Sequence, residues 1–171
     1  GTKIADPYRW LEDSDAPDTR AWIDAQNELT FAYLKQVPER ERIGARLWQL
    51  WDYERYGVPS REGGWYIFSR NSGKQNQNVV YRAASLDAPP EVLIDPNTLS
   101  ADGTVALGPT AFSDDGKHMA YSLSAAGSDW QEWRVREVAT GRDLPDLLKW
   151  SKFSGASWRK DGSGFYYSRY D

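Results

Sequence analysis

The segment from Phe112 to Trp130, FSDDGKHMAYSLSAAGSDW, constrains the fold of this chain more than any other stretch. An Asp-Gly turn at 115–116 separates a short first strand from a second run in which apolar and polar residues alternate. The alternating apolar residues are Met119, Tyr121 and Leu123. A Gly-Ser-Asp turn then leads into a third strand, Trp130 to Val138. The pattern predicts most of an antiparallel meander.

The same arrangement of a polar turn and an aromatic strand recurs on both sides of this segment. The copies are PSREGGWYIFSRN around Gly63 and WRKDGSGFYYSRY around Gly162, and each strand closes on an aromatic residue followed by Ser. These pairs are Phe68-Ser69, Tyr121-Ser122 and Tyr167-Ser168. The turn glycines, Gly116 included, lie 53 and 46 residues apart, a spacing within the range of four-stranded propeller blades. The repeat therefore favours a β-propeller, although an antiparallel sandwich has similar turns.

Composition limits the partners that this chain can have. It holds nine Trp, ten Tyr and five Phe among 171 residues, and such broad side chains suit sheets, where they pack across strands. The net charge of −4 comes from interspersed charges without a basic stripe, which argues against nucleic acid as a partner. No apolar run is long enough to span a membrane. The absence of Cys excludes disulfides and thiolate metal sites, and it leaves the compartment, cytoplasm or periplasm, undecided.

The first third of the chain reads as an arm followed by two helices. Residues 1–14 form an irregular arm, in which Asp6-Pro7 disfavours helix. A helix is predicted over 17–37 with Asp15 as its N-cap, and a second helix over 39–51 after the break at Pro38. Both helices carry more apolar surface than a solvent-facing helix should show. We therefore expect them to pack against another structural unit.

The remainder of the chain reads as β structure. Strands are predicted near 65–70, 78–83, 91–95, 109–113, 118–124, 131–138, 155–158 and 164–169. The stretch 139–146 is predicted to be a turn region, and 147–153 a loop that crosses to the next sheet. The chain stops directly after an aromatic strand, which would leave a bare sheet edge. We therefore interpret it as a fragment whose N-terminal residue, Gly1, results from processing or cutting.

No combination of residues in this chain predicts chemistry by itself. The Gly-x-Ser-x-Gly elbow of a serine hydrolase is absent. The single histidine, His118, is expected to face solvent from the strand after the Asp-Gly turn. Asp114-Asp115 and Asp102-Gly103 are interpreted as turns whose side chains bond their own backbone, because further oxygen ligands for calcium are missing. We therefore expect no metal and no cofactor, with one or two aromatic residues available as ligand contacts.

Six ordered motifs nevertheless resemble one known family. They are DPYRWLED, WIDAQN, LWDYERYGVP, SGKQNQNVVYR, LIDPNTLSADGTVAL and AFSDDGKHMAYSLSAAGSDW, and together they cover essentially the whole chain. They are similar to the N-terminal part of the prolyl oligopeptidase family, serine endopeptidases that cleave short peptides after proline. The resemblance implies a mainly β fold, with a helical arm over 1–52 and part of a seven-bladed β-propeller over 53–171. The implied blades are about 53–104, about 105–152 and 153–171, the last incomplete.

The resemblance also implies which partners and residues matter. The arm would pack on a C-terminal α/β-hydrolase domain that carries the Ser-Asp-His triad, so no triad residue is assigned to this chain. Phe153, in WSKFS, and Asp129, in GSDW, match cavity-lining family positions that act on peptide binding. Gly108-Pro109 stands where some members carry an Arg that holds the propeller against the catalytic domain. The implied role of this chain is to gate and select short proline-containing peptides.

Two other functions fit the same residues. An oligopeptidase B-type peptidase, which cuts after Lys or Arg, would share the fold and differ in acidic pocket residues outside this chain. A stand-alone propeller-like module that binds peptides is the alternative from a class without catalysis. A Gly-x-Ser-x-Gly elbow in the reading frame after Asp171 would distinguish a peptidase from a binding module.

Overall fold

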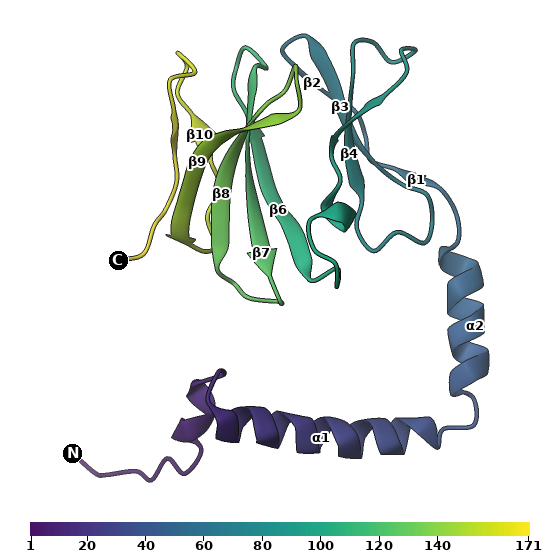
Figure 1. Ribbon diagram of the computed structural model, residues 1–171, viewed down its shortest axis with the longest axis vertical. Helices are drawn as coiled ribbons and strands as arrows, with labels where there is room; N and C mark the ends of the chain where they lie inside the picture. Colours follow the sequence, from purple (N-terminus) through teal and green to yellow (C-terminus); the bar gives the residue numbers. More distant parts are fainter. The chain divides into compact units, whose positions relative to one another are not determined.

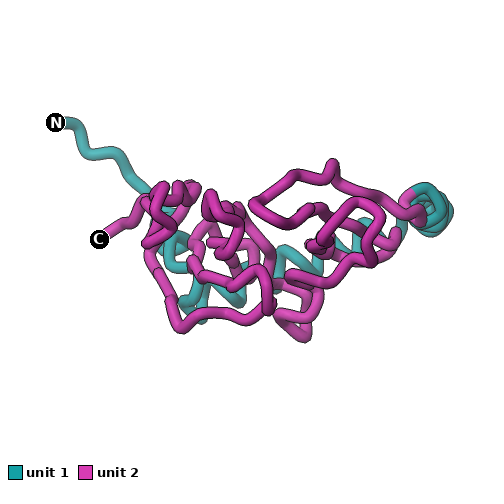
Figure 2. Tube along the Cα trace, turned by 90° about the horizontal axis from the view of Figure 1, so that it is seen from above, with its two compact units in different colours: residues 1–50 teal, residues 51–171 magenta.

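The computed structural model describes residues 1–171 and divides the chain into two compact units, residues 1–50 and residues 51–171 (Figure 2). The first unit is helical, and the second is built from three antiparallel sheets. No helix in the chain combines the length and the apolar composition that crossing a membrane requires.

The helical unit contains a short 3₁₀ helix, Arg9–Glu12, followed by α1, Pro17–Lys35, and α2, Arg40–Trp51 (Figure 1). Both α-helices lie where the apolar periodicity predicts them. Large apolar side chains nevertheless remain exposed along both of them. The most exposed are Leu29, Phe31, Tyr33, Ile43, Trp48, Leu50 and Trp51. The two helices therefore carry apolar surface that their own unit leaves uncovered.

The start of α1 differs from its prediction. Asp15 is not the N-cap: Ala16 takes that position, and no side chain caps the helix. The Asp15 carboxylate instead accepts a hydrogen bond from Arg20 at 2.8 Å. Pro17 has no backbone N–H, so the first turn of α1 has one fewer donor that a capping side chain would need to satisfy. The helix is also held near its start by buried Thr19, whose hydroxyl donates to the carbonyl of Trp10 at 3.1 Å.

The first sheet follows α2 in the chain. Its strands are β1, Arg55–Tyr56, β2, Ser60–Glu62, β3, Trp65–Asn71, β4, Val79–Ala83, and β5, Glu91–Ile94. Their order is β1-β3-β4-β5, with β2 also paired to β3, so β1 and β2 together make one interrupted edge strand. The short helix Pro96–Thr98 then leads to the second sheet.

The second sheet is a meander of four strands in sequence order. They are β6, Val105–Phe112, β7, His118–Ala125, β8, Gln131–Glu137, and β9, Arg142–Ser151. The predicted turns and the alternation along β7 are confirmed here. The register of β6 against β7 slips between Leu107 and Thr110, so Gly108-Pro109 forms an irregularity in an outer strand.

The strand β9 corrects the sequence prediction. The stretch 139–146 was predicted as a turn and 147–153 as a loop, but residues 142–151 form the longest strand of the chain. β9 pairs only with β8 and lies at an edge of the sheet, where the missing N–H of Pro145 is tolerated. Its residues show no clean alternation of burial. The turn itself is confined to the residues before Arg142, where Gly141 adopts a φ of 70°.

A third, two-stranded sheet pairs β10, Ser157–Trp158, with β11, Phe165–Tyr166. Both faces of the second sheet are covered by its neighbours. On one face, Met119 and Tyr121 share a core cluster with Ile67 and Leu93 of the first sheet. On the other face, fully buried Trp133 packs on Phe165 of the third, with ring centroids 6.0 Å apart. The three sheets therefore stack face to face, as Figure 1 shows.

Two of the repeated turn glycines, one from the first sheet and one from the second, lie where the turns of these two sheets touch. Gly63 and Gly116 both have positive φ, 56° and 68°. A Cβ on Gly63 would lie 2.4 Å from the carbonyl oxygen of Asp115, and a Cβ on Gly116 would lie 2.4 Å from that of Glu62. Gly162 of the third copy has the same backbone conformation, with nothing within 4 Å of a Cβ. The spacing of the first two sheets at this point thus requires glycine on both sides.

Candidate functional site

The two residues predicted to bind substrate lie at the same end of the second sheet. Asp129 is in the turn between β7 and β8, and Phe153 follows the end of β9. Gln131 pairs with Ser151 in the β8–β9 register, which places both residues just past the same end of this strand pair. Phe153 is 76% exposed. The Asp129 side chain is exposed and makes no hydrogen bond or ion pair, whereas Ser128 accepts the backbone N–H of Trp130 at 3.1 Å.

Two buried serines hold the segment that contains Phe153. Ser151 accepts a hydrogen bond from the indole N–H of Trp133 at 3.1 Å and donates to the carbonyl of Ser168 at 2.8 Å. Ser154 accepts the backbone N–H of Ser168 at 2.8 Å. The two residues between these serines, Lys152 and Phe153, have no such anchor and stand away from the sheet. The sequence Ser-Lys-Phe-Ser therefore folds locally as an outward bend between two fixed points.

Backbone strain is concentrated at this end of the second sheet. Three residues other than glycine have positive φ: Ala126 at 52°, Trp150 at 64° and Phe153 at 53°. Ala126 lies in the turn that contains Asp129, Trp150 is the second-last residue of β9, and Phe153 lies in the bend after that strand. A bulky side chain in this backbone region is unusual, and such residues tend to occur at functional sites.

Four aromatic side chains gather around the bend, and we call them the aromatic rim: Trp130, Trp150, Phe153 and Tyr170. The ring of Trp130 meets Trp150 edge to face at 5.7 Å and Tyr170 in the same way at 5.8 Å. The backbone N–H of Tyr170 donates to the carbonyl of Trp150 at 2.8 Å, which fixes the end of the chain against β9. Edge-to-face pairs of this kind add to the stability that burial alone provides.

A lysine lies over the rim. The ammonium nitrogen of Lys152 is 4.7 Å from the ring centroid of Trp130, 5.4 Å from that of Tyr170 and 5.7 Å from that of Phe153. All three distances are within the range of a cation–π interaction. The rim therefore presents an aromatic surface together with a positive charge.

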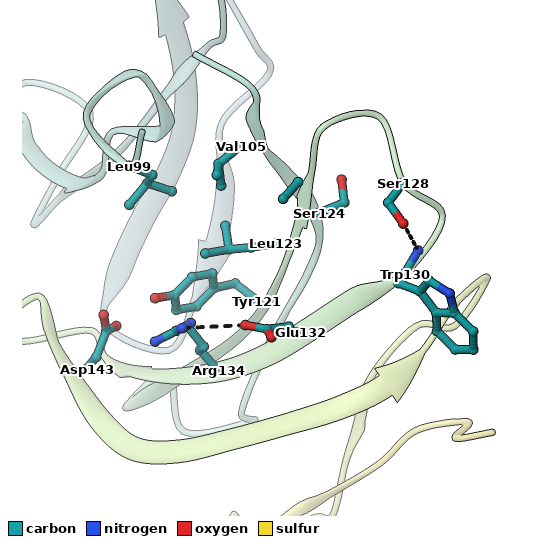
Figure 3. Close-up of a pocket in the computed structure, with 11 residues that line it drawn as sticks. Leu99, Val105, Tyr121, Leu123, Ser124, Ser128, Trp130, Glu132, Arg134 and Asp143 are labelled. Atoms are coloured by element: carbon teal, nitrogen blue, oxygen red, sulfur yellow. Dashed lines mark hydrogen bonds and ion pairs between the residues drawn. The ribbon is translucent and has the colours of Figure 1, made fainter. Parts of the chain in front are cut away.

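A hollow of about 500 Å³ adjoins the rim and shares Trp130 with it (Figure 3). In Figure 3, Trp130 lies at one end of the hollow and Asp143 at the other, with Tyr121, Arg134 and Glu132 between them. Apolar side chains complete the lining: Leu99, Val105, Leu123 and Ala125. Glu132 of the lining is paired, because it lies 3.6 Å from Arg134 and 3.5 Å from Lys149, which lies outside the lining.

A partly buried charge pair lies at the end of this hollow that Asp143 lines. Arg136 donates two hydrogen bonds to Asp143, at 2.7 and 2.9 Å, and a third to the carbonyl of Leu93 in the first sheet at 2.6 Å. Its guanidinium also lies 5.2 Å from the ring centroid of Tyr121. Burial raises the pKa of Tyr121 to about 12; the charge of Arg136 opposes this shift and the Asp143 carboxylate adds to it. Burial is the largest single effect on Asp143 and favours its protonated form, but hydrogen bonds from Arg136 and Tyr121 together with the charges of Arg136 and Arg134 outweigh it and lower the pKa of that carboxyl.

The predicted position of His118 is wrong. Its ring is half-buried and stacks on Trp158 of the third sheet, with centroids 6.0 Å apart. His118 and Trp158 line a second hollow of about 500 Å³ between the second and third sheets, together with Leu148 and Phe165. His118 begins β7 on the face that Trp133 shares, so the neighbouring sheet covers it where a single sheet would expose it.

The interpretation of the aspartates as turn residues is confirmed. Asp115 accepts hydrogen bonds from the backbone N–H of Lys117 at 3.1 Å and the hydroxyl of Ser113 at 2.8 Å. Asp102 accepts from the backbone N–H of Thr104 at 3.1 Å. No group of three or more His, Cys, Asp or Glu side chains is arranged to hold a metal ion. The residues gathered at the rim and its hollow are aromatic, apolar and singly charged, which suits binding of a peptide better than bond-breaking chemistry.

Comparison with known proteins identifies the chain. Residues 1–171 match the family described as the N-terminal β-propeller domain of prolyl oligopeptidase. The chain belongs to this family. The resemblance drawn from the six motifs is therefore confirmed, and so is the fold: mainly β, with an N-terminal helical arm and part of a propeller whose sheets do not close into a ring.

Curated relatives of the chain are prolyl endopeptidases. The one from Elizabethkingia meningoseptica is 42% identical over 171 residues, which are 100% of this chain and 24% of the relative. The one from Dictyostelium discoideum is 32% identical over 208 residues, covering 98% of this chain and 27% of the relative. The chain therefore spans about a quarter of the length of the curated relatives it matches.

Solved structures give the same result. A prolyl endopeptidase structure superposes with a TM-score of 0.87 at 35% identity, covering 98% of this chain and 25% of that chain. Prolyl oligopeptidase B from Galerina marginata, bound to a 35mer hydrolysis and macrocyclization substrate, superposes with a TM-score of 0.82 at 31% identity over 98% of this chain and 26% of its own. Oligopeptidase B from Leishmania major, at 16% identity and a TM-score of 0.80, shares the fold alone, over 98% of this chain and 25% of its own.

Proposed function

We propose that this chain is the N-terminal part of a prolyl-oligopeptidase-type serine endopeptidase that hydrolyses short peptides after proline, and that this part gates and selects the substrate. The observation that carries the proposal is the match over residues 1–171 to the propeller domain of that family, with prolyl endopeptidases as relatives at up to 42% identity. Residues 1–52 are proposed as the arm. The proposed blades are about 53–104, about 105–152 and 153–171, the last incomplete.

Within this function, Phe153 and Asp129 are proposed to contact the peptide away from the scissile bond. Three features support this role. Phe153 is held outward between two anchored serines, Asp129 has no partner within the chain, and Asp129 directly precedes Trp130 of the aromatic rim to which Phe153 belongs and which adjoins a hollow. A substrate side chain can stack on the rim and bury apolar area there. These contacts select the peptide without touching the reacting atoms.

The exposed apolar residues of α1 and α2 fit a second part of the proposal. A C-terminal α/β-hydrolase domain of the same protein is proposed to cover them and to supply the Ser-Asp-His triad. Side chains such as Phe31 and Trp48, each 60% exposed, are the kind that a domain interface buries. The propeller is then a cap on that domain, and access of the peptide depends on how the two parts separate.

The test compares the full-length protein with the isolated 171-residue chain. Each is assayed for release of a chromophore from a blocked Gly-Pro substrate and from the matching Gly-Arg substrate. We expect the full-length protein to cleave after proline and the isolated chain to be inactive, because it holds neither nucleophile nor oxyanion donors for the reaction. Cleavage after Arg alone would establish the oligopeptidase B type instead. If the full-length protein bound the peptides without cleaving them, the protein would be a peptide-binding module instead.

A further inference from the structure

Lys152 is the residue at the rim whose charge the function above does not use. Three of the four other lysines of the second unit lie close to carboxylates, Lys74 near Asp52 at 2.7 Å, Lys117 near Asp115 at 2.9 Å and Lys149 near Glu132 at 3.5 Å, and the fourth, Lys160, is exposed in a turn. Lys152 has no carboxylate within 4.0 Å and donates no hydrogen bond within the chain, although its side chain is half-buried. Its three N–H donors are therefore free.

The aromatic rings fix where this free charge is presented. Contacts with Trp130, Tyr170 and Phe153 restrain a side chain that would otherwise sample many rotamers. The rings attract the ammonium group but do not neutralise its charge as a carboxylate does. They also shield part of this group from water. A carboxylate that approaches the rim therefore meets an ordered ammonium group, and less conformational entropy is lost when the pair forms than with a freely moving surface lysine.

The rim is also electrostatically asymmetric. Asp129 immediately precedes Trp130 in the chain and has no ion-pair partner, whereas the unpaired cation of Lys152 lies over the Trp130 ring itself. Lys152 already occupies the aromatic surface, so a cationic substrate group gains little from these rings. An anionic group gains at the Lys152 side.

We propose that Lys152 is a specificity-determining residue that binds a carboxylate of the peptide substrate while the substrate rests on the aromatic rim. The inference rests on the proposed function, since it concerns which proline peptides the full-length protein prefers. The carboxylate can be a Glu or Asp side chain of the peptide or its free C-terminus. Both sources present the same chemistry to the ammonium group.

The experiment measures kcat/KM of the full-length protein on matched peptides. One pair differs by Glu against Gln at a residue near the cleaved proline, scanned on both sides, and a second pair differs by a free C-terminal carboxylate against an amide. The variants are Lys152→Met, which keeps the apolar stem over the rings, and Lys152→Arg, which keeps the charge. Lys160→Met, in the exposed turn between β10 and β11, removes the same charge away from the rim and serves as the control.

For one of the two pairs we expect the wild-type protein to prefer the carboxylate peptide by about two- to fivefold at low salt, the range of an exposed ion pair. Lys152→Met should bring that ratio to about one through KM, with kcat on the neutral peptide kept. Lys152→Arg and Lys160→Met should keep the preference, and added salt should reduce it in all three charged forms. The pair that responds identifies the source of the carboxylate.

The result that overturns the inference is a ratio that is the same in the wild type and Lys152→Met for both pairs, while proline peptides are still cleaved. A loss of preference in Lys160→Met as large as in Lys152→Met would also overturn it, because net charge would then explain the effect. Absence of cleavage of any proline peptide by the wild-type protein would instead overturn the proposed function together with this inference. Equal melting temperatures of the variants verify that they are folded.

Discussion

Truncation of Phe153 to alanine tests the proposed peptide contact most directly. The ring is 76% exposed, and a Phe side chain offers about 200 Å² of surface, so about 150 Å² is free for a ligand. A substrate side chain that covers half of this area removes about 75 Å² from water. At about 25 cal/mol per Å² the contact stabilises the complex by about 2 kcal/mol, which corresponds to an increase in KM of about 30-fold for Phe153→Ala.

The assay is steady-state kinetics of the full-length protein on neutral blocked proline peptides. The contact is made equally in the ground state and the transition state, so KM should rise while kcat stays nearly constant. Phe153→Tyr keeps the ring and should stay close to the wild type. A thermal melt completes the test, because an exposed side chain contributes little to folding. A collapse of kcat with KM and melting temperature unchanged would refute the reasoning, and so would a KM that alanine leaves unaltered.

Two further predictions concern the stability of the second unit. Gly116→Ala should lower the melting temperature more than Gly162→Ala, by the equivalent of about 1–3 kcal/mol, because both lose the same backbone freedom but only the former forces a Cβ to within 2.4 Å of a backbone oxygen; equal melts would contradict this. The raised pKa of Tyr121 means that its contribution to stability is complete below about pH 10 and is lost as the pH rises towards 12. Melting temperatures between pH 9 and 12 should therefore fall less steeply for Tyr121→Phe, and an equal slope would exclude Tyr121 as the group responsible.

Most strands could be predicted because packing against neighbouring sheets requires apolar side chains at alternate positions of the strand. Met119 and Tyr121 alternate with residues of the opposite face in β7, which has a paired strand on either side and a sheet against each face. Most residues of the strand β9 are exposed, so burial imposes no alternation on it, and Pro145, which an edge strand tolerates, reads as a turn signal. His118 was misplaced for a related reason: a single strand does not reveal that Trp158 of another sheet will cover it.

The candidate site could be predicted only in part. Phe153 and Asp129 were named from their resemblance to family positions, since an exposed phenylalanine and an aspartate in a turn carry no signal of their own. Lys152 was missed, because its role depends on rings that come from three separate segments, at residues 130, 153 and 170. The nearest signal in the sequence is the pair of serines around Lys152 and Phe153, which becomes meaningful once both are seen to be anchored.

The left-handed backbone at Trp150 and Phe153 has a consequence for protein engineering. Glycine would adopt φ values of 64° and 53° without penalty, whereas each aromatic residue there costs about 1 kcal/mol or more of backbone strain. Directed evolution that rewards only survival on heating would therefore tend to replace these rings with glycine. Its most heat-resistant products would be the variants that no longer discriminate between peptides. A library of the full-length protein needs turnover of a chosen peptide as a second selection, or these two codons held constant.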